Sequence, residues 1–157
     1  MPFVVTNEVK IIMFQYKVIH NVLPTRATLY RDGISESPLC NLCRTEKQTL
    51  HHLLINYMPT IDFWILFQDW WYIETNETIT LTTSHILYGC DRTKHWQALN
   101  YCLLAAKYCI FCTSLRGDVL DFQTFLWLIH GKLEILKEIA IAKKELPKFY
   151  RTWNFLL

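Results

Sequence analysis

The sequence is short of charge and of glycine, and it contains no low-complexity segment or internal repeat. Only 19% of its 157 residues are charged and four are glycine, whereas hydrophobic residues make up 52%. Intrinsic disorder needs the opposite balance, so this composition excludes a disordered chain. A chain of this length buries roughly 70% of its unfolded surface, which is enough for a core of its own. The sequence therefore predicts a single domain over residues 1–157.

Catalytic motifs and targeting segments are missing as well. The sequence has no glycine-rich phosphate loop, no Gly-x-Ser-x-Gly turn and no aspartate pair in the setting that polymerases use to hold two metal ions. Its first ten residues include Glu8 and Lys10 instead of a basic and then apolar leader. Residues 99–115 are apolar, but Asn100 and Lys107 interrupt a run already shorter than the about 20 residues that span a bilayer. We therefore expect a non-enzymatic, intracellular protein of the cytoplasm or nucleus that does not enter a membrane.

The spacing of the apolar residues predicts an all-α fold. The expected helical segments are residues 8–23, a short helix between the cap Thr25 and Gly33, 50–57 after the cap Thr49, 59–71, one turn closed by Gly89, 94–115, 121–144 and a short aromatic helix over 149–155. In the first helix the expected buried face consists of Val9, Ile12, Met13, Tyr16, Ile19 and Leu23. The two long segments have the widest apolar stripes, so we expect an antiparallel C-terminal helical pair over residues 94–144. Residues 75–83 are polar and β-branched, which predicts an irregular connection.

One short stretch of the sequence has the residue types of a metal-binding site. Cys40 and Cys43 have the spacing of a tight turn whose sulfur atoms converge on one point. His52 follows on a short helix, from which its ring can reach the same point. These three residues are candidate zinc ligands in a small knuckle, residues 38–58, inserted into the helical domain. A Cys-Cys-His-Cys knuckle would have its fourth ligand five residues after the histidine, where this chain has Tyr57.

Several alternatives stay open for these residues. Water, His51 and Asp62 are candidates for the fourth ligand position. One alternative to a structural zinc site is that the two cysteines lie on a turn and bind no metal. Another is a catalytic zinc site, in which Glu46 would be the general base within reach. Cys109-x-x-Cys112 has the same spacing, but it lies in an apolar helical run, where free cysteines usually pack into the core.

A longer series of residues matches one known family in order and spacing. It comprises Phe14 to Thr25, Leu29-Tyr30, Ser37 to Cys43, Glu46, Thr49 to Leu53, Phe63-Trp64, Ile86 to Gly89, Leu103 to Ile110 and Ile139 to Trp153. With these residues the chain resembles the zinc-binding region C-terminal to the reverse transcriptase in LINE-type (non-LTR) retrotransposon polyproteins. The resemblance implies zinc as the cofactor, held by Cys40, Cys43 and His52. The family pattern has a cysteine where this chain has Tyr57.

The resemblance also implies a function and partners. It indicates a non-catalytic accessory domain that binds RNA or DNA beside the reverse transcriptase portion of a larger polyprotein. The net charge is only +2, which predicts weak binding that tolerates any base sequence. The candidate phosphate contacts lie toward the two ends of the chain and are Lys10, Lys17, Arg26, Arg31, Lys143, Lys144, Lys148 and Arg151. The alternative is a metal-free helical interaction module, in which the knuckle is vestigial and the excess of apolar residues serves docking on another protein.

Overall fold

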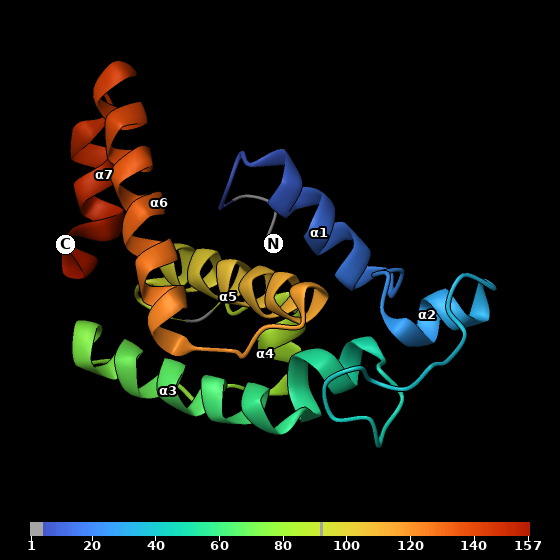
Figure 1. Cartoon of the computed structure of the whole chain (residues 1–157). Helices are drawn as coiled ribbons and strands as arrows, with labels where there is room; N and C mark the ends of the chain where they lie inside the picture. The colour runs from blue at the N-terminus through green and yellow to red at the C-terminus, as the bar shows by residue number, and fades with distance from the viewer. Residues whose placement is uncertain (1–4, 92) are drawn as a thin grey trace.

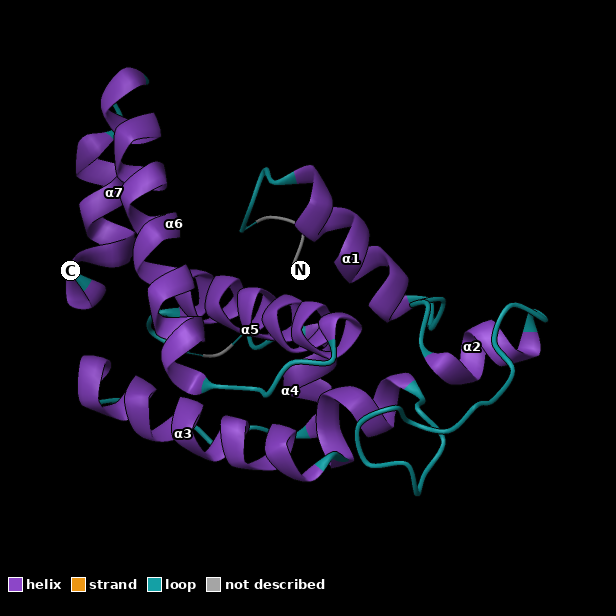
Figure 2. Cartoon of the chain, viewed as in Figure 1, coloured by secondary structure: helices purple, strands orange, loops and turns teal. Residues whose placement is uncertain are grey.

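The computed structural model describes residues 5–91 and 93–157 and confirms an all-α domain (Figure 2). Within these ranges there is no strand, and one isolated antiparallel bridge joins Leu39 to Lys47. The helices are α1 (Val9–Ile19), α2 (Arg26–Arg31), the π-helical turn η2 (His52–Asn56), α3 (Met58–Thr75), α4 (Thr83–Tyr88), α5 (Trp96–Arg116), α6 (Phe122–Ala142), α7 (Leu146–Trp153) and the 3₁₀ turn η3 (Asn154–Leu156).

Local capping fixes several of the predicted boundaries. The Thr25 hydroxyl accepts a hydrogen bond from the Thr28 amide at 3.4 Å at the start of α2. The Asp121 carboxylate accepts from two amides in the first turn of α6. Gly117 ends α5 with a φ of 70°, a conformation that costs glycine little because it has no Cβ. Residues 77–82 form the expected irregular connection between α3 and α4.

The central helix is α5, against which α1, α6, α7 and η2 pack (Figure 1). By length and hydropathy alone α5 could cross a membrane, but 83% of its most apolar 18-residue window is buried inside the protein. The apolar spacing of the segment 94–115 predicts one buried stripe along α5, and every residue of that stripe is buried. Its residues are Leu99, Cys102, Ala106, Cys109, Ile110 and Thr113. A helix that buries residues on nearly all sides is the core of its domain, and Cys109 belongs to that core.

Among the described residues, Lys107 is the lysine that is buried in the core of the domain. Lys107 on α5 is 2% exposed, and its Nζ donates to Gln15 Oε1 of α1 and, at 3.2 Å, to the Leu87 carbonyl of α4. Gln15 Nε2 donates to the same carbonyl at 2.8 Å. Neither partner is charged, and burial lowers the pKa of Lys107 to about 7. This polar cluster ties α1 and α4 to α5.

The predicted buried face of α1 is wrong. Val9, Met13 and Tyr16 are exposed, Ile12 and Ile19 are half-buried, and Leu23 is buried beyond the end of the helix. The buried residues of α1 are Ile11, Phe14, Gln15 and Val18. A hydrophobic pattern assigns glutamine to the surface, but here its amide hydrogen-bonds Lys107 and faces the core. Ile11, Phe14 and Val18 have the i, i+3, i+7 spacing of a second apolar stripe, and this stripe together with Gln15 is the one that is buried.

The two long helices do not pack antiparallel along their lengths. In Figure 1 α6 rises across α5, and α7 folds back beside α6. The buried residues of α6 are Phe125, Ile129, Leu133 and Ala140, whereas Ile139 is 44% exposed. The antiparallel pair of the C-terminal region is therefore α6 and α7.

Candidate metal centre

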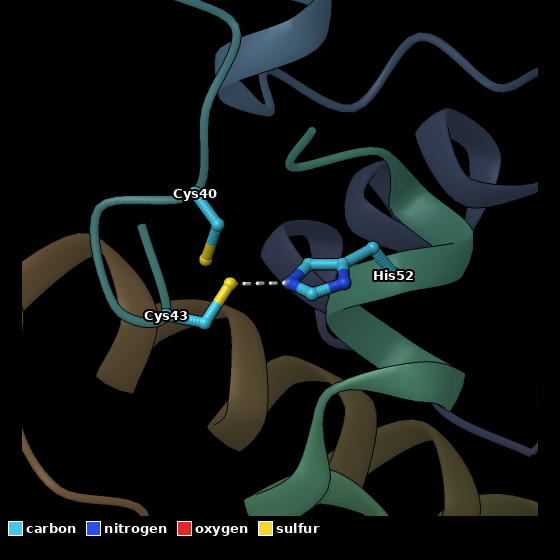
Figure 3. A group of neighbouring side chains, drawn as sticks. All are labelled: Cys40, Cys43 and His52. Carbon is cyan, nitrogen blue, oxygen red and sulfur yellow. Dashed lines mark hydrogen bonds between the residues drawn. The ribbon is translucent and has the colours of Figure 1, made fainter. Parts of the chain in front are cut away.

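The loop before η2 folds into a tight turn that brings the two cysteines together. The Cys40 amide donates to the Glu46 carbonyl at 2.7 Å, and the Arg44 amide donates to the Cys40 carbonyl at 2.9 Å. Arg44 takes the left-handed conformation with a φ of 60° and closes the turn directly after Cys43. The sulfur atoms of both cysteines then point toward the same space (Figure 3).

A π-helical turn positions the histidine. The Thr49 hydroxyl accepts from the His52 amide at 3.0 Å, which confirms the predicted cap. The Tyr57 amide donates at 2.7 Å to the His52 carbonyl, five residues earlier. We expected an ordinary helix at 50–57, because an apolar run of this length does not distinguish the two helix types. Isolated π-turns are frequent at functional sites, and the ring of His52 faces both cysteines (Figure 3).

The three side chains form a group that could hold a metal ion. The Sγ atoms of Cys40 and Cys43 and a ring nitrogen of His52 lie within 4.8 Å of one another. Cys43 Sγ and His52 Nε2 are 3.5 Å apart. Zinc bonds of about 2.3 Å to sulfur and about 2.0–2.1 Å to nitrogen, at a tetrahedral angle, would place these atoms about 3.5 Å apart. The observed spacing therefore matches two ligands of one tetrahedral ion.

Two residues outside the ligand group contact it. His52 Nδ1 lies 3.3 Å from Glu46 Oε2, a close contact that lacks the alignment of a hydrogen bond. A carboxylate at one ring nitrogen leaves the other free for a metal. Gln48 donates from Nε2 to Cys40 Sγ at 3.6 Å and accepts from the Arg26 amide of α2 at 3.1 Å. Sequence reasoning named Glu46 only as a base in reach of a catalytic zinc, and it missed Gln48, because the Arg26 amide that Gln48 binds is 22 residues away and no local spacing marks it.

The surroundings of Cys43 favour its thiolate. Burial by itself raises the pKa of this thiol. Hydrogen bonds from the hydroxyl and amide of Thr45, from the Glu46 amide and from Cys40 outweigh that effect and lower the pKa to about 6. The thiolate is the form of cysteine that binds metals. A set of two thiolates and one imidazole fits zinc and does not fit magnesium or calcium, which take oxygen ligands.

Tyr57 lies beside the ligand group. Its ring centroid is 5.8 Å from that of His52. Burial, followed by the charges of Cys40 and Cys43, raises the pKa of the Tyr57 hydroxyl, so it remains protonated at neutral pH. His51 and Asp62, the other candidates for the fourth position, are exposed. Among the described histidine, cysteine and acidic residues, only the three named ligands meet.

The eight basic residues predicted to contact nucleic acid lie in two separate places. Lys10, Lys17, Arg26 and Arg31 belong to α1 and α2, whereas Lys143, Lys144, Lys148 and Arg151 belong to the end of α6 and to α7. All are exposed except Arg26, which is half-buried, and Arg31 forms an ion pair with Asp32 at 3.1 Å. Figure 1 shows α2 and α7 at opposite ends of the molecule. The residues therefore form two surfaces and no continuous stripe.

In comparisons with protein-family models, with curated proteins and with solved structures, nothing matches this chain. The likeness to the zinc-binding region of LINE-type polyproteins therefore stays a prediction, supported by the order and spacing of residues in the sequence.

Proposed function

We propose that this chain is a non-catalytic accessory domain that binds RNA or DNA, and that a zinc ion held by Cys40, Cys43 and His52 fixes its knuckle, residues 38–58. The single observation that carries the zinc is the 3.5 Å spacing between Cys43 Sγ and His52 Nε2, with Glu46 behind the other ring nitrogen. The domain would serve, as the resemblance implies, beside a reverse transcriptase in a larger polyprotein.

A bound ion would add to the few contacts that stabilise the loop of the knuckle. Of residues 38–48 only Cys40 and Gln48 are buried, so apolar packing contributes little there. When bound, zinc would join the cysteine turn to η2 and thereby to α5, since η2 packs against that helix. Structural zinc sites stabilise folds in this way because the unfolded chain has no preformed site.

The zinc proposal is tested by the metal content of protein produced with zinc present. We expect one zinc ion per chain, lost in Cys43→Ser and retained in the control Cys112→Ser, which alters a cysteine outside the group. Tyr57→Cys should tighten zinc binding by completing a four-ligand set. Wild-type protein without zinc would end this part of the proposal.

The surface at the end of α6 and on α7 is the better supported nucleic-acid contact. Lys143, Lys144, Lys148 and Arg151 are exposed there, with Glu145 as the acidic residue among them. Lys143 and Lys148 also line a hollow of about 230 Å³. The other lining side chains come mainly from the N-terminal segment, α6 and α7. Clustered cations beside a hollow are suited to a phosphate backbone, which fixes position without reading the base sequence.

The nucleic-acid proposal is tested by measuring affinity for RNA and DNA across a series of salt concentrations. We expect weak binding with about three to five phosphates engaged. Replacing Lys143, Lys144 and Lys148 together by Ala should flatten the slope of log affinity against log salt by up to about three units and leave the helical circular dichroism unchanged. A control that removes the exposed Lys47 and Lys94 should change the slope less. An absence of binding at low salt would refute the proposal.

A metal-free helical interaction module is the second candidate function. It is favoured by the outer face of α3, where large apolar side chains are exposed. Absence of both zinc and nucleic-acid binding, together with an intact helical fold, would support this candidate.

A further inference from the structure

The α3 helix is apolar on all sides although it lies at the edge of the molecule (Figure 1). Its inner face is buried through Phe63, Trp64, Phe67 and Trp71. Its outer side chains are Met58, Ile61, Ile65, Leu66, Tyr72 and Ile73, which are between 37% and 76% exposed. A helix with apolar residues all round is normally buried on both sides, and a contiguous apolar face of this kind marks an interaction surface.

The charges on the outer face of α3 are acidic only. Asp62 and Asp69 are exposed and lie within the apolar stripe, and α3 contains no lysine or arginine. The two aspartates are seven residues apart, which is about 10.5 Å along a helix and close to two full turns. They therefore project from the same side, between Ile61 and Ile65 on one flank and Leu66 on the other.

The exposed face of α1 has the complementary pattern. Val9, Met13 and Tyr16 form its apolar stripe. Lys10 and Lys17 run along one edge of that stripe, both exposed and also seven residues apart. A hollow of about 340 Å³ between α1 and α5 adjoins this face and is lined in part by Tyr108 and Phe111. It offers room for the apolar side chains of a docking helix.

We infer that the outer face of α3 in one copy of this chain docks on the exposed face of α1 in a second copy. The spacing of Asp62 and Asp69 matches that of Lys10 and Lys17, so two ion pairs form at once along two packed helices. None of these four residues takes part in an ion pair within the described part of the chain. Pairing α3 with α3, or α1 with α1, would place like charges opposite each other.

The contact forms between copies because one copy cannot make it alone. In Figure 1 α1 and α3 lie on opposite sides of α5. A contact between two different faces is heterologous, so each copy keeps one free α1 face and one free α3 face. Assembly therefore continues past the dimer into rings or chains as the concentration rises.

The test measures the weight-average mass by light scattering and sedimentation, without nucleic acid and over a range of protein concentrations. At low salt the wild-type mass should rise continuously with concentration, and high salt should reduce it. Asp62→Lys with Asp69→Lys should give a monomer, and so should Lys10→Glu with Lys17→Glu. An equimolar mixture of the two double variants should associate again, because each supplies the charge that the other now needs.

Matched controls separate this contact from a general effect of charge. Glu134→Lys with Glu138→Lys changes the net charge by the same amount as Asp62→Lys with Asp69→Lys. Lys143→Glu with Lys144→Glu changes it by the same amount as Lys10→Glu with Lys17→Glu. All four control residues are exposed and lie outside the two docking faces. Both controls should assemble like wild type. A wild-type protein that stays monomeric at low salt, a mixture that fails to associate, or controls that dissociate as the reversals do would each overturn the inference.

This inference is independent of the nucleic-acid proposal. The variant without Lys143, Lys144 and Lys148 keeps both docking faces, so its salt slope for nucleic-acid binding should flatten while it still self-associates. Failure of self-association therefore leaves the result for nucleic-acid binding unaffected.

Discussion

The loop that carries the two cysteines and the helix at the centre of the fold are stabilised by different forces. Of residues 38–48 only Cys40 and Gln48 are buried, whereas α5 buries 15 of its 21 residues. Backbone hydrogen bonds and the ligand group close the loop, and the removal of apolar surface from water, at roughly 25 cal/mol per Å², stabilises the core. Loss of a bound metal should therefore loosen the loop and leave the helices in place.

Phe125→Ala is the strongest test of how far apolar packing stabilises the core. Phe125 is 0% exposed and contacts Phe63, Phe67 and Trp70, so the variant leaves a cavity and should lose about 3–5 kcal/mol of unfolding free energy. Chemical denaturation with and without chelator measures it. The loss should be the same in both conditions, and Trp127→Ala, at a 68% exposed position of the same helix, should cost far less. An equal cost for both would contradict the packing described for α6.

Lys107→Met should sharpen the contrast by removing the buried amino group of Lys107 from the core. The folded pKa of Lys107 is about 7 and the ordinary lysine value is about 10.4, so between these pH values the unfolded chain binds more protons than the folded one. The titration of Lys107 therefore makes the unfolding free energy of the wild type rise between pH 7 and pH 10, by up to about 1.4 kcal/mol per pH unit. Its contribution to stability is lowest below pH 7. The variant should therefore exceed wild type in stability most below pH 7 and least near pH 10.

Urea unfolding at several pH values measures this difference. The control is Lys143→Met at an exposed position, where the stability difference from wild type should not depend on pH. A Lys107 variant that is less stable than wild type at pH 7 would mean that the ammonium is better satisfied by Gln15 and Leu87 than its burial implies.

Glu46→Ala tests the loop side of the contrast. Glu46 faces His52 Nδ1 at 3.3 Å, and loss of a residue that orients a ligand typically weakens metal binding about 10–100-fold. Competition with a coloured chelator measures the affinity, while circular dichroism should show unchanged helices. Glu36→Ala removes another exposed carboxylate near the loop and is the control. Equal affinities for the two variants would exclude a role for Glu46.

Arg44→Gly should have the smallest effect and the opposite sign. A residue other than glycine in the left-handed conformation costs about 1–2 kcal/mol of stability. Glycine avoids this strain, but it makes the unfolded chain more flexible, which costs about 0.5–1 kcal/mol. The substitution therefore recovers only part of the strain. The metal-free loop should gain up to about 1 kcal/mol, seen as slower amide exchange at residues 40–48. Asn41→Gly, outside the left-handed region, should speed that exchange. Faster exchange in Arg44→Gly would show that its side chain stabilises the turn.

The sequence by itself determined the helical class, most helix boundaries and the three residues of the candidate metal site. Thr25, Thr49 and Asp121 cap helices through atoms two or three residues away, so a short stretch of sequence contains the whole interaction. Cys40 and Cys43 are likewise placed by one turn. Such features depend on local spacing, which can be read along the chain.

Only the tertiary structure decided which faces of the helices are buried and what supports the site. The sequence offers two apolar stripes for α1, and the one that is buried also contains Gln15, which accepts a hydrogen bond from Lys107, 92 residues away. The contact between Glu46 and His52 and the π-turn of η2 are local, but apolar spacing does not distinguish them from other arrangements of the same residues. The packing of α7 on α6 and the burial of Lys107 depend on neighbours that come together only when the whole domain has folded.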